Sequence, residues 1–276
     1  MSLTKIPAVM IDGNVGSGGS GIRLSASSEA YPETDVTATS TLYYGAATLD
    51  ISAAEAGKNY DVFMSPGGVL VIGPAWTNSV TRTMAIVEVD GKFVNADAIG
   101  SLAAEAGELV GGFRCHAAGQ TRSTLQSRLV WSLGGAVIMP VCRVDTTNTW
   151  TYSAASWRQA NGSALNQIEV FNGVSGRMVK VDAAGYVVNG TSTVVAGFTG
   201  IGIDSSTADS AQVKRPGAGS NTFPIIPPSA SYSGFLGLGY HELRWLERGN
   251  GGSQTWYGDA GQPAGYQTGI SGFVVI

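Results

Sequence analysis

Residues 238–247 read LGYHELRWLE, and their side chains alternate in character. In an extended chain His241, Leu243 and Trp245 fall on one side, and Glu242 falls on the other. Such a period of two is typical of a half-buried strand in an antiparallel sheet, with one face on the core and the other in water. This stretch therefore predicts a β protein.

The same strand signals recur along most of the chain. Apolar, β-branched and aromatic runs are bounded by Gly, Pro, Asn and Asp, and two hairpin turns are explicit in Ser65-Pro66-Gly67-Gly68 and Asp90-Gly91. We expect strands near residues 22–26, 41–44, 60–65, 69–72, 84–89, 92–95, 111–116, 136–143, 150–152, 167–171, 178–182, 194–203, 238–248 and 272–276.

One segment has helical spacing. Leu125 and Leu129 fall on one face over residues 121–131, and Ser123 precedes them as an N-cap. The predicted fold class is therefore all-β, an antiparallel sandwich or jelly-roll-like architecture with one short helix at about 121–131.

The glycine-rich stretch GNVGSGGSG at residues 13–21 predicts a flexible linker. We expect an N-terminal arm and linker over residues 1–21 and a β domain over 22–276. A division of that domain into two lobes near 160–175 is left open. The apolar run at residues 8–11 is suited to adding a strand to a neighbouring subunit.

Composition and charge restrict the function. The chain has 39 glycines, 13% charged residues and a net charge of −4. A nucleic-acid binder needs clustered cations, which this sequence does not offer. No run of about 18 apolar residues predicts a membrane span, so we expect the chain to fold in a cytoplasm.

The groups that enzymes use are sparse. The two histidines, His116 and His241, lie far apart, and the two cysteines, Cys115 and Cys142, sit in separate β-like runs as expected of buried thiols. No ligand pair has the short spacing of a structural zinc site. We therefore expect no catalytic residues, no metal and no cofactor.

Binding chemistry is better represented near the C-terminus. Residues 251–266 read GGSQTWYGDAGQPAGY and place aromatic rings among short polar groups. Such rings can stack on sugars, so the candidate glycan or receptor site is Trp256, Tyr257, Asp259 and Tyr266. The alternative is that Trp256 and Tyr257 end a strand and pack on the core or on a neighbouring subunit.

Ten short phrases occur in order over most of residues 22–259. They are Thr41-Leu42-Tyr43-Tyr44, Tyr60-Asp61-Val62-Phe63, Trp76 with Arg82, Asp90-Gly91, Gly112 with Arg114, TWTYS at 149–153, WRQAN at 157–161, NQIEV at 166–170, GIGID at 200–204 and LRWLE at 243–247. In that order they resemble a family of tailed-bacteriophage and prophage virion proteins of the tail-fibre or head-fibre type. The segment at 45–59 is short and alanine-rich where the family has a longer insert.

The resemblance implies a non-enzymatic virion protein, assembled in the host bacterial cytoplasm and located in the virion. The main hypothesis is a fibre, spike or receptor-binding appendage of tail or head. One alternative is a capsid decoration (cement) protein, and another, from a different class, is a glycan-degrading tailspike-type enzyme. The expected partners are other virion proteins bound through the N-terminal arm, a host surface glycan, and two further copies in a homotrimer, with no nucleic acid and no membrane span.

Overall fold

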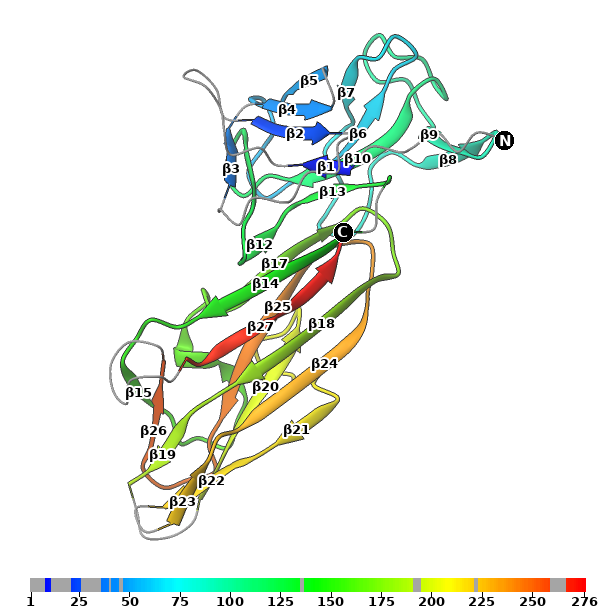
Figure 1. Cartoon of the computed structure of the whole chain (residues 1–276). Helices are drawn as coiled ribbons and strands as arrows, with labels where there is room; N and C mark the ends of the chain where they lie inside the picture. Colours follow the sequence, from blue (N-terminus) through cyan, green and yellow to red (C-terminus); the bar gives the residue numbers. More distant parts are fainter. Residues whose placement is uncertain are drawn as a thin grey trace.

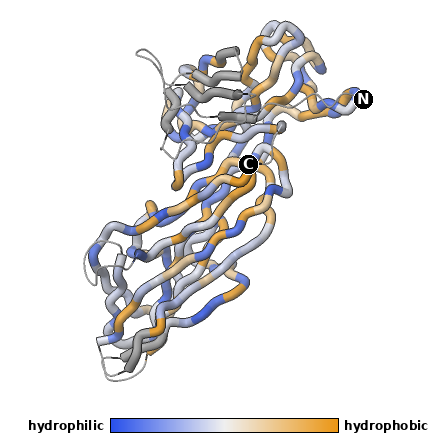
Figure 2. Tube along the Cα trace, viewed as in Figure 1, coloured by the Kyte–Doolittle hydropathy of each residue, from blue (hydrophilic) through white to orange (hydrophobic). Residues whose placement is uncertain are grey.

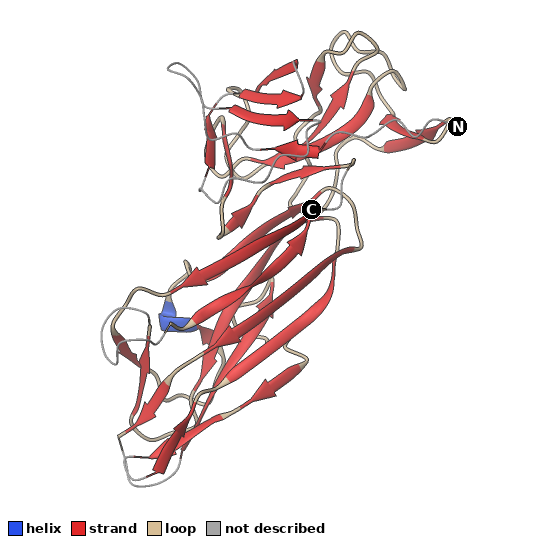
Figure 3. Ribbon diagram, in the orientation of Figure 1, coloured by secondary structure: helices blue, strands red, loops and turns tan. Residues whose placement is uncertain are grey.

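The computed structural model describes residues 8–10, 21–25, 36–39, 41–44, 47–134, 137–190, 195–220, 223–258 and 267–276. Figure 3 shows that these residues form strands and loops almost throughout, which confirms the all-β prediction. Within them, the one helical segment is a single 3-10 turn at Ala160–Gly162, far too short to span a bilayer.

Two lobes are visible in Figure 1, and the upper one holds the N-terminal half of the chain. Its larger sheet has six strands, in the order β7 (Leu70–Ile72), β6 (Asn59–Met64), β10 (Glu108–Arg114), β9 (Lys92–Asn95) and β8 (Ile86–Val89), with β13 (Val130–Ser132) also paired to β10. A four-stranded sheet beside it runs β1 (Ala8–Met10), β2 (Gly21–Ser25), β4 (Thr41–Tyr44) and β5 (Ala47–Asp50).

The lower lobe is a sandwich built on two sheets. The first has nine strands and runs β23 (Phe223–Ile226), β22 (Gly217–Ser220), β20 (Val195–Ile203), β25 (Gly239–Arg248), β17 (Gln167–Asn172), β12 (Ser127–Arg128), β11 (Gln120–Ser123) and β3 (Val36–Thr39), with β16 (Arg158–Gln159) on β25. The second runs β14 (Ile138–Val144), β27 (Gly269–Val275), β18 (Arg177–Ala184), β24 (Ser229–Leu236) and β21 (Val213–Arg215).

A small sheet closes the far end of the lower lobe. It runs β15 (Thr149–Thr151), β26 (Gln254–Tyr257) and β19 (Val187–Asn189), and Figure 1 places it away from the upper lobe.

The core of the sandwich follows from the alternation seen in the sequence. Leu243 and Trp245 of β25 are fully buried between the two large sheets, and Val179 and Val181 of β18 meet them from the other side. Burying such side chains stabilises the fold by about 1.5–3 kcal/mol each. The strand predicted at residues 238–248 is β25, and it lies at the centre of the nine-stranded sheet.

The upper lobe has its own two hydrophobic clusters, one around Phe113 and one around Trp131. Among the clustered buried apolar residues, those up to Trp131 belong to the upper clusters, and those from Met139 onward belong to the core of the sandwich. Phe171 of β17 is an exception, because it packs with Trp131 in an upper cluster. The sequence had left open a division near 160–175. Apart from β1 and Gly21, the arm expected over 1–21 lies outside the described residues, and β1 pairs with β2 of the same chain.

The helix predicted over 121–131 is wrong, because this segment forms β11, β12 and β13 with a tight turn. The Thr124 hydroxyl accepts hydrogen bonds from the backbone N–H of Gln126 (3.2 Å) and of Ser127 (3.1 Å). Such local side-chain bonds compete with a helix. Leu129 is 1% exposed whereas Leu125 is 41% exposed, so the two leucines do not share a buried face.

That turn connects the upper lobe to both sheets of the sandwich. The Leu125 carbonyl accepts from the Cys142 N–H of β14 (2.7 Å), and the Gln126 carbonyl accepts from the Glu169 N–H of β17 (2.8 Å). Strand β12 then pairs in parallel with β17. The nine-stranded sheet therefore runs through both lobes.

Candidate functional site

The structure places the two described members of the predicted binding site in β26. Trp256 is 0% exposed, and its indole N–H donates to the Tyr152 carbonyl (3.0 Å). Tyr257 is half-buried, with its ring edge-on to Tyr186 at 5.3 Å between centroids. Trp256 thus has no exposed ring face for a sugar, the arrangement expected of a packing residue. Asp259 and Tyr266 lie outside the described residues.

A shallow groove opens beside these strands, at the far end of the lower lobe. Its volume is about 490 Å³, and it is lined by the loop that follows β15 and the loop that leads into β26. The lining residues are Thr151, Tyr152, Ser153, Ala154, Gly252, Ser253 and Gln254. All are uncharged, and they offer hydroxyl, amide and backbone groups. This chemistry suits a neutral ligand rich in hydroxyl groups.

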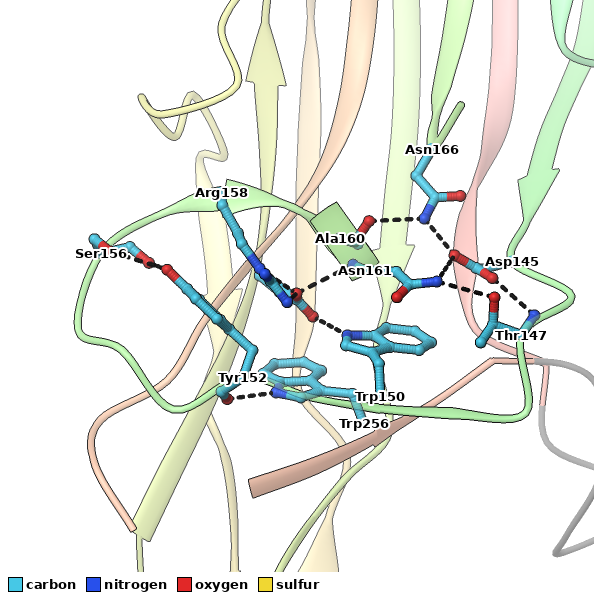
Figure 4. A network of polar contacts seen from close by, with 11 residues as sticks. Asp145, Thr147, Trp150, Tyr152, Ser156, Arg158, Ala160, Asn161, Asn166 and Trp256 are labelled. Carbon is cyan, nitrogen blue, oxygen red and sulfur yellow. Dashed lines mark hydrogen bonds and ion pairs between the residues drawn. The ribbon is translucent and has the colours of Figure 1, made fainter. Parts of the chain in front are cut away.

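Tyr152 is the aromatic member of the groove, and its ring is held in place. Its hydroxyl donates to the Ser156 carbonyl (2.8 Å), and the Arg158 guanidinium lies 3.8 Å from the ring centroid. Figure 4 shows the ring between Ser156 and Arg158, with Trp256 close to its backbone. A fixed aromatic ring loses little entropy when a ligand binds against it.

The Arg158 guanidinium beside the Tyr152 ring also binds a buried carboxylate, Glu247 of β25. The Glu247 side chain is 0% exposed, and it accepts hydrogen bonds from the Trp150 indole (2.6 Å), the Arg158 Nε (2.8 Å) and the Asn161 backbone N–H (3.1 Å). Burial raises the pKa of Glu247, and the bonds from Trp150 and Arg158 oppose that rise. The carboxylate thereby joins β15, β16 and the 3-10 turn to β25.

A second carboxylate continues this network (Figure 4). Asp145 accepts from the side chains of Asn166 (2.5 Å) and Asn161 (3.1 Å). Asn161 has a φ of 58°, a left-handed conformation that Asn tolerates better than most residues. Burial would raise the pKa of Asp145, but hydrogen bonds from Asn166, Thr147 and Asn161 outweigh it and lower the pKa. The loop between β14 and β15 is therefore tied to the 3-10 turn.

The upper lobe contains a comparable buried network. The Asp61 carboxylate of β6 accepts from the Trp76 indole (2.9 Å) and from two nitrogens of Arg82 (2.9 and 2.8 Å). Arg82 also donates to the Gly173 carbonyl (2.6 Å), just beyond β17. This ion pair therefore contacts both halves of the chain.

Two carboxylates also meet on the outer face of the nine-stranded sheet. Glu169 of β17 is the cross-strand partner of Glu242 of β25, and the Tyr240 hydroxyl lies 2.7 Å from one and 3.0 Å from the other. Arg122 pairs with Glu169 at 2.5 Å, and Arg244 pairs with Glu242.

This pair bears on the glycan-degrading alternative, because glycosidases use two neighbouring carboxyl groups. A general acid for that reaction needs a raised pKa. Burial would raise the pKa of Glu169, but bonds from Ser127, Tyr240 and Arg122 outweigh it and lower the pKa. Through the Arg122 and Ser127 bonds, Glu169 joins β11 and β12 to the sandwich.

The remaining reactive groups lie apart. Cys115 is a buried free thiol whose pKa is raised by burial to about 11, and Cys142 is a half-buried free thiol. His241 contacts Asp204 through Nδ1 at 2.8 Å. Within the described residues, no group of three or more His, Cys, Asp or Glu side chains is arranged to hold a metal ion.

Comparison with known proteins gives no further assignment. No protein-family model matches the chain, and no curated protein matches it either.

The structure separates the predicted site from the groove. Trp256 is buried, whereas Tyr152 and Ser253, which were not selected from the sequence, line the groove. The site predicted at Trp256, Tyr257, Asp259 and Tyr266 stays a prediction. Nothing in the sequence pairs the loop at Tyr152 with residues 252–254.

Proposed function

We propose that this chain is a non-enzymatic structural and binding component of a bacteriophage particle, an appendage of tail or head. The observation that carries the proposal concerns the phrases that resemble the virion family. In the fold, several of them meet each other in buried polar networks.

Two buried networks each join residues from different phrases. Asp61, Trp76 and Arg82 come from two phrases and form one buried cluster. The phrase residues Trp150 and Arg158 bind Glu247 of a third phrase. The shared pattern therefore specifies the buried framework of this fold. That supports a relationship in architecture, and a structural role is the function that the proposed family implies.

The groove beside Tyr152 is the place where such an appendage would contact a host surface glycan. It is lined by residues of β15, β26 and their adjoining loops, and Figure 1 shows these two strands at the end of the lower lobe away from the upper lobe. Its uncharged lining matches sugar hydroxyls, and one ring face of Tyr152 is already held against Arg158. The N-terminal side of the chain is then free to attach to other virion proteins.

Immunogold electron microscopy tests the virion assignment. Antibodies to the purified chain should label particles of the phage or induced prophage that encodes it, and antibody pre-absorbed with the chain should not. Label found only in the soluble fraction of the lysate would contradict the assignment.

A groove-filling variant tests the binding role separately. Ser253→Trp should reduce binding to purified surface polysaccharide of the host, measured by biolayer interferometry, with an unchanged melting temperature. Ser101→Trp is the matched control, because Ser101 is an exposed serine of the upper lobe. Equal binding by both variants would exclude the groove as the glycan site and leave the virion assignment standing.

A further inference from the structure

The outward face of the five-stranded sheet is regularly paired. Its strands align in continuous rows, for example Pro140, Phe273, Lys180 and Ser233 across β14, β27, β18 and β24. The next row is Cys142, Ser271, Asp182, Ser231 and Val213. Two sheets can pack face to face when the side chains of such rows interdigitate.

One end of this face is apolar. Phe235 and Ile138 are 70% and 65% exposed, and Met178 lies between their strands at 38%. Pro140, Phe273 and Val275 complete the patch, which we call the apolar corner. Figure 2 shows hydrophobic segments on these strands beside the C-terminus. Contiguous exposed apolar side chains on a sheet mark an interaction surface.

The other end of the face has small side chains. Its last row is Val144, Gly269, Ala184 and Ser229, followed by Arg215 on the edge strand. Large residues at one end and small residues at the other are complementary in shape when two such faces meet in opposite directions.

Among the residues that the structure describes, the charges in the middle of the face are Lys180 and Asp182 of the central strand. They lie two residues apart on β18, so both point outward. Lys180 takes part in no ion pair within the described part of the chain, and the Asp182 carboxylate accepts from the Ser231 hydroxyl (2.5 Å). When a second copy of β18 runs in the opposite direction across this face, its Asp182 can lie opposite Lys180 and its Lys180 opposite Asp182. The two facing pairs are then both of opposite charge.

We infer that this face binds a second copy of the chain across a two-fold axis that crosses β18 between Lys180 and Asp182. The axis sets each Lys180 opposite the partner's Asp182. It also sets each apolar corner against the partner's row of small residues. A two-fold interface is self-complementary by construction, and this face meets that requirement in both charge and shape.

The area reaches the lower end of what a specific dimer needs. Two strands have eight residues, two have seven and the edge strand β21 has three. At about 4.8 Å between strands and about 3.3 Å per residue they give a footprint near 520 Å² per copy. Two copies then bury about 1,000 Å², the smallest area expected of a biological interface. This inference goes beyond the proposed function and does not depend on it.

Native mass is the first test. Light scattering on the full chain at micromolar concentration should give twice 28.4 kDa. Phe235→Lys should return the mass to that of a single chain. That chain should still unfold cooperatively, because Phe235 is 70% exposed and is not part of the core. Leu165→Lys is the matched control, since Leu165 is equally exposed but lies outside the sheet, and it should leave the dimer intact.

A monomer at that concentration overturns the inference, and so does a dimer that persists in Phe235→Lys. A mass of three chains, as expected for the homotrimer that the resemblance implies, overturns the two-fold arrangement.

Charge reversal tests the axis itself. Lys180→Asp and Asp182→Lys should each weaken self-association by about tenfold or more, because like charges then face each other twice. A mixture of the two variants should form a hetero-dimer, since every facing pair is again opposite in sign. Failure of the mixture to associate more tightly than either variant alone would overturn the proposed axis.

Discussion

Replacing Glu247 by alanine should destabilise the sandwich by about 4 kcal/mol. The carboxylate is 0% exposed, and its loss leaves two donors without an acceptor, the Trp150 indole and the Asn161 backbone N–H. Each unsatisfied buried donor costs about 1–3 kcal/mol. The Arg158 side chain is 35% exposed, so water can replace part of its lost hydrogen bonding to Glu247. The broken Arg158–Glu247 ion pair therefore adds less to the destabilisation. Removing one partner of a buried ion pair is known to cost about 3–5 kcal/mol.

Differential scanning calorimetry measures the effect. For a chain of this size, about 4 kcal/mol corresponds to a fall of roughly 8 °C in the melting temperature. Glu108→Ala is the matched control, because Glu108 also pairs with a cation, Lys92, but is 47% exposed. Exposed ion pairs contribute little to stability, so Glu108→Ala should have the same melting temperature as the wild type. A Glu247→Ala protein that melts within about 2 °C of the wild type would refute the reasoning.

Three further predictions follow from single contacts. The pKa of His241 is raised, because the interaction with Asp204 outweighs the effect of burial. The protonated imidazole therefore stabilises the fold fully below the unfolded pKa of about 6.5, and this stabilisation is lost as pH rises through the folded pKa. The melting temperature of the wild type, measured relative to that of His241→Gln, should fall between pH 6 and pH 8. In the Phe235→Lys variant, whose sheet face should be uncovered, iodoacetamide at pH 8 should alkylate Cys142 before Cys115, whose pKa is about 11. Peptide mass spectrometry measures the two rates, and equal rates would contradict the burial of Cys115. Gly239→Ala should lower the melting temperature by more than Gly68→Ala, because its φ is 111° and its new Cβ would lie against the Ser79 carbonyl oxygen, whereas Gly68 has open space.

The alternating pattern at 238–247 was sufficient to predict the central strand, and Asp90-Gly91 was sufficient to predict the β8–β9 hairpin. Both depend on local physics: period-two burial and a turn that accepts positive φ. The turn after β11 was misread because leucines four apart fit a helix as well as two separate strands. Only the contacts of Thr124 and of β14 and β17 distinguish the two.

The candidate groove was less accessible to sequence reasoning. Tyr152 and Ser253 are about a hundred positions apart, and their meeting depends on the antiparallel pairing of β15 with β26. Trp256 attracted attention as an aromatic residue among polar neighbours. Its burial depends on Tyr152 and on strand β19, which no local pattern predicted.

The sheet that runs through both lobes also determines how the molecule carries a mechanical load. Strands β20, β25 and β17 are joined by long antiparallel ladders, but β12 meets β17 through only the pairs Ser127–Glu169 and Arg128–Val170. Tension applied between the two lobes would therefore load this short parallel joint, together with the Arg82–Gly173 and Cys142–Leu125 hydrogen bonds. These few contacts, and not the long ladders of the lower lobe, are where the two lobes should separate first under force.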